Sequence, residues 1–132
     1  MTTAPTFGLR RALAARKATG PLRDFYAVPP PPSATPASEL GLLAIDAETT
    51  GLDPARDAVL SVGHLPVDGP RILLGGATHR LVNAGVAVGQ SAVFHGITDD
   101  DVAAGEDLTE VVAGVLAALT GRVLLAHFAY IE

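Results

Sequence analysis

The feature that most constrains the fold is a short apolar run without polar alternation, LLAI at residues 42–45. A strand buried on both faces has this pattern, because successive side chains of a strand point to opposite faces of the sheet. A second run of this kind, VLLAH, occurs at residues 123–127. Both runs are bounded by polar or glycine residues and are too short for an ordinary helix, so both are predicted to be buried strands.

Two strand-like segments lie between these runs, AVLSVGHLPV at residues 58–67 and RILLGGATHRLV at residues 71–82. They are joined by Asp68-Gly69-Pro70, which is typical of a hairpin turn. The two segments are therefore predicted to be antiparallel neighbours in a sheet.

Capping residues mark the starts of two helices. Thr98 followed by Asp101 predicts a short helix, and Asp107 followed by Glu110 repeats the pattern. The second helix carries an apolar face with helical spacing, made of Leu108, Val111, Val112, Val115, Leu116 and Leu119. Gly121 is predicted to end it. Three strands, two helices and a fourth strand in this order predict an α/β fold.

The first forty residues differ from the rest of the chain. Residues 1–27 are predicted to be a basic N-terminal arm, residues 28–39 a Pro-rich linker, and residues 40–132 the folded domain. The arm holds five of the nine basic residues, all before the first acid: Arg10, Arg11, Arg16, Lys17 and Arg23. We interpret it as an arm that is solvated or lies against the domain. The alternative is a targeting presequence, which is Arg-rich and poor in acids.

Composition excludes several classes of function. Without cysteine the chain has no disulfide, no thiolate zinc site and no cysteine nucleophile. No apolar run approaches the ~20 residues of a membrane-spanning helix, and no signal-peptide core occurs, so we expect a cytoplasmic protein without a membrane partner. The net charge of -5 argues against a broad basic nucleic-acid face, but it permits local contact through metal ions.

Two carboxylates, Asp46 and Glu48, follow the first apolar run. Residues at i and i+2 of a strand project to the same side, so the two acids would crowd at one strand end. Paired carboxylates favour a hard cation such as Mg²⁺ or Mn²⁺. The alternative is that both acids lie in a solvated loop just after the strand.

The string DAETTGLD, which begins at Asp46, resembles the first motif of the DEDD-type, DnaQ-like 3'-5' exonucleases of the ribonuclease H-like superfamily. The match runs through Asp46, Glu48, Thr49, Thr50, Gly51 and Leu52, at the end of the first core strand, where this family has its first motif. Six matches in register are improbable by chance, because each residue type makes up only a few per cent of an average protein.

Two further stretches are similar to family motifs in the same order. VFHGITDDDV at residues 93–102 resembles the His-Gly-Ile-Thr segment that lines the pocket for the terminal nucleotide, with His95 as its histidine. LLAHFAYIE resembles the second motif, Ala-His-Asn-Ala-x-Phe-Asp. His127 matches, Phe128 replaces the Asn, Ile131 replaces the Phe, and Glu132 replaces the metal-binding Asp.

The resemblance covers residues 40–132 and implies a ribonuclease H-like mixed sheet and metal-assisted hydrolysis of the terminal phosphodiester of a single-stranded nucleic acid 3' end. It implies two Mg²⁺ or Mn²⁺ ions held by Asp46, Glu48 and Glu132. These ions would activate the attacking water and stabilise the leaving oxygen. The residues implied to contact the terminal nucleotide are Thr49, Thr50, Gly51, His95 and His127.

The family's third motif, a general-base histidine with a fourth aspartate, has no counterpart before Glu132. We therefore expect an incomplete sequence with reduced catalysis, because a positioned base contributes ~10²–10⁴-fold. A non-catalytic module that binds strand ends or a DNA polymerase is the alternative, and another nuclease of the ribonuclease H-like fold is a third.

The sequence also indicates structural roles for the histidines and for the acids of residues 99–101. His64 and His79 are expected at the surface or on an edge strand, His95 in the pocket or stabilising a turn, and His127 in the site or in the core. The acids of residues 99–101 are expected to complement a helix dipole. DNA or RNA as the substrate is not decided by these motifs.

Overall fold

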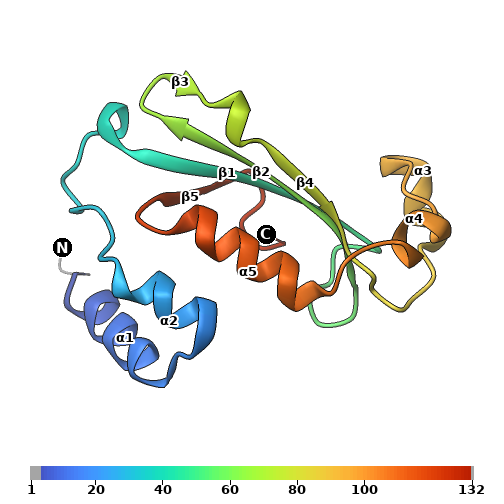
Figure 1. Ribbon diagram of the computed structural model, residues 1–132, viewed down its shortest axis with the longest axis horizontal. Helices are drawn as coiled ribbons and strands as arrows, with labels where there is room; N and C mark the ends of the chain where they lie inside the picture. Colours follow the sequence, from blue (N-terminus) through green and yellow to red (C-terminus); the bar gives the residue numbers. More distant parts are fainter. Residues whose placement is uncertain (1–3, 132) are drawn as a thin grey trace.

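A computed structural model describes residues 4–131 as five α-helices, three short 3-10 turns and one mixed sheet of five strands. The strand order is β3-β2-β1-β5, and β4 also pairs with β2 (Figure 1). Strand β1 (Gly41–Thr49) is antiparallel to β2 (Val59–Asp68) and parallel to β5 (Val123–Ala126). The predicted α/β fold with a mixed sheet is confirmed.

The predicted hairpin forms, but its second half is split. Strands β3 (Arg71–Ile72) and β4 (Thr78–Leu81) both pair antiparallel with β2, and a 3-10 turn, η2 (Leu74–Gly76), separates them. Pro66 of β2 explains the break, because it has no N–H to donate to a continuous neighbour. The Pro66 carbonyl accepts the Leu73 N–H at 2.9 Å. The second segment therefore leaves the sheet beside Pro66 and rejoins it at residue 78.

Helix α5 (Leu108–Leu119) covers one face of the sheet (Figure 1). Its Val111 is fully buried against Val62 and Val82, and Val115 and Ile45 pack against this cluster. A second cluster lies near the short helices and is formed by Leu60, Val88, Ile97 and Val102. The predicted apolar face of α5 is only partly buried, because Leu108 and Val112 each remain 44% exposed.

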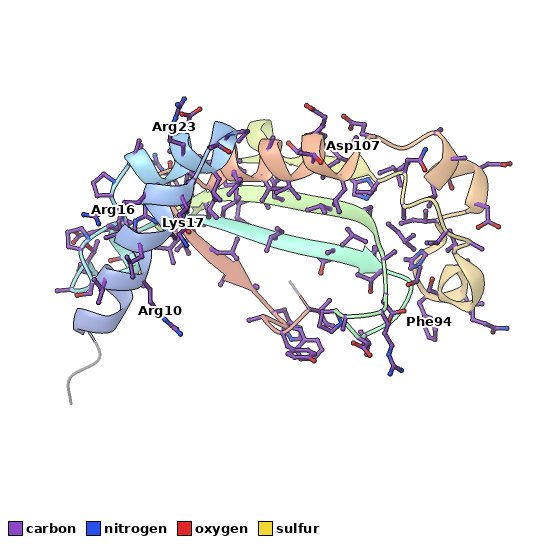
Figure 2. The ribbon with its side chains drawn as sticks, turned by 90° about the horizontal axis from the view of Figure 1, so that it is seen from below. Arg10, Arg16, Lys17, Arg23, Phe94 and Asp107 are labelled. Atoms are coloured by element: carbon purple, nitrogen blue, oxygen red, sulfur yellow. The ribbon has the colours of Figure 1, made fainter. Side chains whose placement is uncertain are left out.

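The expectation that residues 42–45 and β5 are buried on both faces is wrong. Leu43 is fully buried, but Leu42 is half-buried, and the side chains of Leu124 and Leu125 are 42% and 48% exposed. Among the described residues, α2 and α5 lie on one side of the sheet and no helix covers the other side (Figure 2). Apolar continuity therefore indicated strands correctly but not the number of covered faces.

The two capped helices form as predicted, with one difference. Helix α4 (Asp99–Ala103) has the full capping box between Thr98 and Asp101. At α5 the Asp107 carboxylate accepts the Thr109 N–H at 2.8 Å, and Glu110 does not complete a box. A short helix not predicted from the sequence, α3 (Ala92–His95), precedes α4, after a 3-10 turn, η3 (Gly89–Ser91).

The N-terminal arm is helical. Helices α1 (Ala4–Lys17) and α2 (Gly20–Ala27) form a hairpin, and α2 packs against α5. Residues 28–36 have no regular element, and a 3-10 turn, η1 (Ala37–Glu39), leads into β1. None of the helices in the described residues has the length and hydrophobicity needed to span a membrane.

Candidate active site

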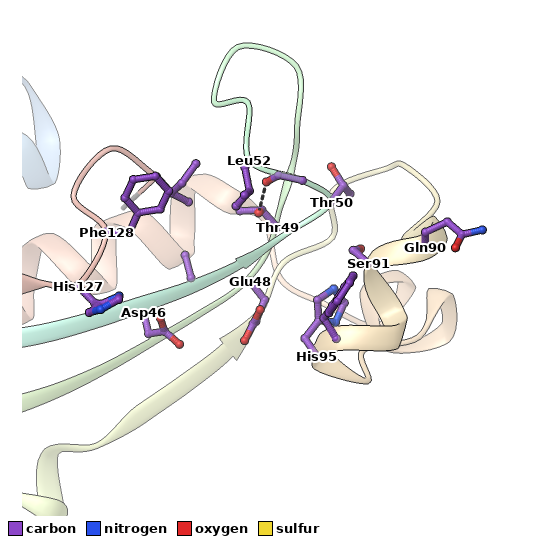
Figure 3. Close-up of a pocket in the computed structure, with 14 residues that line it drawn as sticks. Asp46, Glu48, Thr49, Thr50, Leu52, Gln90, Ser91, His95, His127 and Phe128 are labelled. Carbon is purple, nitrogen blue, oxygen red and sulfur yellow. Dashed lines mark hydrogen bonds between the residues drawn. The ribbon is translucent and has the colours of Figure 1, made fainter.

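Asp46 and Glu48 lie within β1, two residues apart. Their side chains point to the same side of the strand (Figure 3). The alternative placement, in a loop after the strand, is wrong. The ladder with β2 is regular as far as Glu48 and shifts register between Glu48 and Thr49, which is where the chain leaves the sheet. The sheet thus fixes the backbone of both carboxylates, and the residues after them form a loop.

Both carboxylates line a pocket of about 510 Å³ at the end of β1 (Figure 3). Every predicted site residue within the described chain lines it: Asp46, Glu48, Thr49, Thr50, Gly51, His95 and His127. Glu132, the third predicted carboxylate, lies outside the described residues. The three motifs therefore meet at one place, although Asp46 and His127 are 81 residues apart in the chain.

The loop after β1 is organised by Asp57, which was not identified from the sequence. Its Oδ1 accepts the Thr50 hydroxyl at 3.0 Å, and its Oδ2 accepts the Asp53 N–H at 2.9 Å. The Asp57 carboxylate also fills the space beside Gly51, where a Cβ would lie 2.5 Å from Oδ2. Gly51 is therefore required here by this close approach and not by an unusual backbone angle.

The two threonine hydroxyls are already used inside this loop. Thr49 donates to the carbonyl of Gly51, while Thr50 donates to Asp57 and accepts the Ala58 N–H at 3.0 Å. Both threonines thus shape the pocket wall, and their predicted contact with a nucleotide, through backbone and hydroxyl groups, stays a prediction.

His95 ends α3 on the far side of the pocket from His127 (Figure 3). Its Nδ1 accepts the Ile97 N–H at 3.1 Å across Gly96, which has a left-handed φ of 74°. Within the described residues its Nε2 is buried and has no hydrogen-bond partner. His95 therefore both stabilises the turn and lines the pocket, so the two roles considered for it are compatible.

His127 follows β5 and lies beside Asp46 at the pocket wall (Figure 3). It is exposed and lines the pocket instead of lying in the core. Phe128 and Tyr130 follow it with ring centroids 6.0 Å apart, and they are 49% and 67% exposed. Phe128, which replaces the asparagine of the second motif, thus places an aromatic ring at this pocket.

The other two histidines lie away from the pocket. His79 is exposed on β4, as expected. His64 lies in β2, which has strands on both sides, so its placement on an edge was wrong, and its side chain is partly exposed. Burial lowers the pKa of His64, and the positive charge of Arg80 lowers it further by a smaller amount. Among the described residues, the buried Nδ1 of His64 has no hydrogen-bond partner.

The acids of residues 99–101 are engaged at the start of α4. Asp99 accepts the Val88 N–H at 2.8 Å, and hydrogen bonds from the Thr98 hydroxyl and N–H lower the pKa of Asp101. Their predicted structural role is consistent with these contacts. In residues 4–131, no three histidine or acidic side chains lie close enough together to hold a metal ion.

The pocket itself offers part of a metal-binding set. Asp46 and Glu48 present only oxygen ligands, which suit Mg²⁺ or Mn²⁺ better than a soft metal. In metal sites of this kind the protein commonly supplies one or two carboxylates, and water or substrate completes the coordination. The two acids therefore fit such an ion.

Three pocket residues, Gln90, Ser91 and Phe94, were not identified from the sequence. They come from η3 and α3, whose starts carry no strong capping signal. Phe94 is 90% exposed, the largest value among the exposed large apolar side chains of the described chain. The one sequence signal for Phe94 was its position just before His95, the histidine of the His-Gly-Ile-Thr segment.

The mixed α/β sheet carries two carboxylates at the end of its first strand, and the family comparison identifies it as a nuclease-type hydrolase domain. Residues 43–131 match the exonuclease family model of the RNase T type, and the chain belongs to this family. The resemblance derived from the motifs is thus confirmed. No curated protein matches the sequence.

Solved structures of exonuclease I share the fold. An apo exonuclease I is 18% identical, with a TM-score of 0.58 over 67% of this chain and 21% of its own. The enzyme from Methylocaldum szegediense is 20% identical, with a TM-score of 0.57 over 66% and 20%. Escherichia coli exonuclease I in complex with a dT13 oligonucleotide is 18% identical, with a TM-score of 0.55 over 67% and 20%. This chain therefore spans about a fifth of the length of these proteins.

Proposed function

We propose that the protein is a metal-dependent 3'-5' exonuclease that removes nucleoside monophosphates from the end of single-stranded DNA. The observation that carries this proposal is the pairing of Asp46 and Glu48 on one side of β1, inside a pocket that also contains Gly51, His95 and His127. The exonuclease I structures bound to dT13 and dA13 support a DNA strand as the substrate. RNA is the other substrate to test.

In this proposal Asp46 and Glu48 hold Mg²⁺ or Mn²⁺, with Glu132 as a further ligand. Such an ion supplies an activated water and stabilises the negative charge on the leaving oxygen. The chain's own residues position the strand end. The loop braced by Asp57 forms one wall, and the unpartnered Nε2 of His95 gains a partner when a phosphate or sugar oxygen enters.

Hydrolysis and metal binding test this function together. The protein should shorten a 5'-fluorescein-labelled dT20 strand from its 3' end with Mg²⁺ or Mn²⁺ and release dTMP. The double variant Asp46→Asn with Glu48→Gln keeps the shape of both side chains and should lose at least about 100-fold of the rate. Mn²⁺ titration calorimetry should show loss of binding in the same variant.

Asp100→Asn is the matched control, because Asp100 is an exposed acid away from the pocket. Hydrolysis that stays within twofold in the double variant contradicts the proposed site. Label that is released first from a 5'-labelled strand contradicts the proposed polarity. A parallel assay with U20 decides between DNA and RNA.

A second candidate is a module that binds strand ends, or a DNA polymerase, without cutting. It is favoured by one observation: within the described residues the pocket has two carboxylates and no third. This candidate predicts binding of dT20 with no dTMP release in Mg²⁺ or Mn²⁺.

A further inference from the structure

The charges of this protein are divided between its two parts. Residues 1–27 carry five basic side chains and one acid, a net charge of +4, whereas residues 28–132 carry four basic side chains and 13 acids, a net charge of -9. A strand of phosphates is therefore repelled by most of the sheet domain and attracted by the helical hairpin.

The sheet domain has four arginines to offset this, of which Arg56 and Arg71 are exposed and the other two are held in structural contacts. Arg80 forms an ion pair with Glu106 and donates to the carbonyl of Glu110 at 3.0 Å, which ties β4 to α5. Arg122 pairs with Asp68 and ties the start of β5 to β2. These two arginines are occupied by structural contacts and are poorly placed to bind phosphate.

In the hairpin one arginine is structural and the others are free to bind. Arg11 faces α2, where its guanidinium lies 5.1 Å from the ring centroid of Phe25 and 4.8 Å from that of Tyr26, and donates to the Val28 carbonyl at 2.7 Å. The remaining cations are exposed on both helices: Arg10, Arg16, Lys17 and Arg23. Figure 2 shows them at one end of the molecule.

Within residues 4–131, Arg23 is the one of these four with a carboxylate within 4.0 Å. Its Nε lies 3.5 Å from Asp24, and both side chains are at least 70% exposed. An exposed pair of this kind is weak and is easily exchanged for a phosphate. The four exposed cations of the hairpin are named the hairpin cations below.

The hairpin is held in place relative to the pocket. Helix α2 packs against α5, and Val28 lies beside Gly121 at the turn that leads into β5. The hairpin cations thus lie near the start of β1 and β5, and the pocket lies where β1 ends (Figures 1 and 2). The pocket carboxylates Asp46 and Glu48 lie five and seven residues after Gly41, the start of β1, which is about 17 and 23 Å at ~3.3 Å per residue.

We propose that the hairpin cations bind the phosphate backbone of a single-stranded nucleic acid whose 3' end occupies the pocket. This inference rests on the proposed function and adds a second, distal contact to it. At a stacked spacing of about 3.4 Å per nucleotide, this distance corresponds to about five to seven nucleotides. The hairpin therefore holds long strands and is out of reach of very short ones.

The test measures binding in EDTA, so that no hydrolysis occurs. The probes are 5'-fluorescein dT20 and dT4, read by fluorescence anisotropy between 50 and 200 mM salt. The variant Arg10→Gln, Arg16→Gln, Lys17→Gln, Arg23→Gln should weaken dT20 binding at least about tenfold. It should also reduce the salt slope by about 3, since each phosphate contact on a single strand contributes about 0.7. Its affinity for dT4 should change less than twofold.

A charge-preserving control separates binding from folding. Arg10→Lys, Arg16→Lys, Arg23→Lys keeps four positive charges and should bind dT20 like the parent protein. Unchanged dT20 affinity in the glutamine variant overturns the proposal, as does equal loss for dT4 and dT20. Leu9 and Leu13 are also exposed on α1, so vesicles with phosphatidylserine are tested too. Loss of vesicle binding with intact dT20 binding identifies a membrane site and overturns the proposal.

These results can be told apart from failure of the proposed function. The binding comparison needs neither metal nor hydrolysis, so it stands even if the parent protein releases no dTMP. Conversely, dTMP release with Mg²⁺ together with equal dT20 binding by parent and glutamine variant leaves the exonuclease proposal intact and removes the hairpin from it.

Discussion

Phe94 is the residue whose position is hardest to explain by folding alone. A large apolar side chain that is 90% exposed contributes little to the core, and it lines the pocket that holds Asp46 and Glu48. Aromatic rings beside a strand-binding site commonly stack on nucleobases, an interaction of about 1–3 kcal/mol per base. Phe94 is therefore placed to contact a base near the strand end.

Phe94→Ala should weaken binding of dT4 and dT20 by about 5- to 160-fold, the range that this stacking energy implies. Its urea midpoint should hardly change, because an exposed side chain contributes within about 0.5 kcal/mol. Val93→Ala is the matched control, since Val93 is 81% exposed on the same helix and does not line the pocket. Equal affinities of the two variants for both strands contradict the stacking role.

At the scale of single residues, the sequence predicted the features that depend only on the spacing of residues along a strand. Asp46 and Glu48 share a side because strand periodicity requires it. Asp57 could not be predicted in the same way, because its contacts with Thr50 and Asp53 depend on how a loop closes. The use of both threonine hydroxyls within that loop depends on the same closure.

At the scale of elements, strand β2 carries a pH-sensitive side chain, that of His64. Burial, and secondarily the Arg80 charge, lower the pKa of His64 below its ordinary value of 6.5. The folded state therefore prefers the neutral imidazole. The stability that this contributes is fully present above pH 6.5 and is lost as the pH falls through 6.5 toward the lower pKa of the folded state.

We expect the urea midpoint to fall between pH 7.5 and pH 5.5, and His64→Gln to reduce this fall. His79→Gln is the control, because His79 is exposed on the neighbouring strand β4. Chemical denaturation followed by circular dichroism at five pH values measures the effect. A His64→Gln variant with the same pH dependence as the parent protein contradicts the assignment.

Elements were predictable where the signal is local and less so where it depends on neighbours. The capping box of α4 needs only Thr98 and Asp101, and it formed as predicted. The break between β3 and β4 depends on Pro66 in the opposite strand, which a reading of each segment by itself does not include. The exposure of β5 likewise depends on which face of the sheet the helices cover.

At the scale of the whole molecule, the N-terminal hairpin and the sheet domain form an electrostatically divided protein. This division of charge is visible in the sequence. The contact of the arm with α5, through α2, depends on tertiary packing. Prolines before the domain indicated a linker, and the structure adds that α2, which precedes that linker, packs against α5. Packing of α2 on α5 therefore joins the hairpin to the sheet domain, and the contacts of Arg11 with Phe25, Tyr26 and the Val28 carbonyl join α1 to α2.

Arg11→Ala should loosen the hairpin without unfolding the sheet. It removes the contacts with Phe25, Tyr26 and the Val28 carbonyl, and a cation–π contact alone contributes about 0.5–2 kcal/mol. Trypsin should then cut after Lys17 several times faster, and the amides of α2 should exchange faster with solvent. The amides of β1 and β2 should keep their protection.

Arg10→Ala is the matched control, because it removes an exposed arginine from the same helix and leaves the Arg11 contacts in place. It should leave cleavage at Lys17 and exchange in α2 unchanged. Equal cleavage rates in the Arg11→Ala variant and the parent protein would show that packing of α2 on α5 holds the hairpin by itself. If Arg11→Ala does loosen the hairpin, it should also weaken dT20 binding more than loss of one charge does, because the hairpin cations then lose their fixed distance from the pocket.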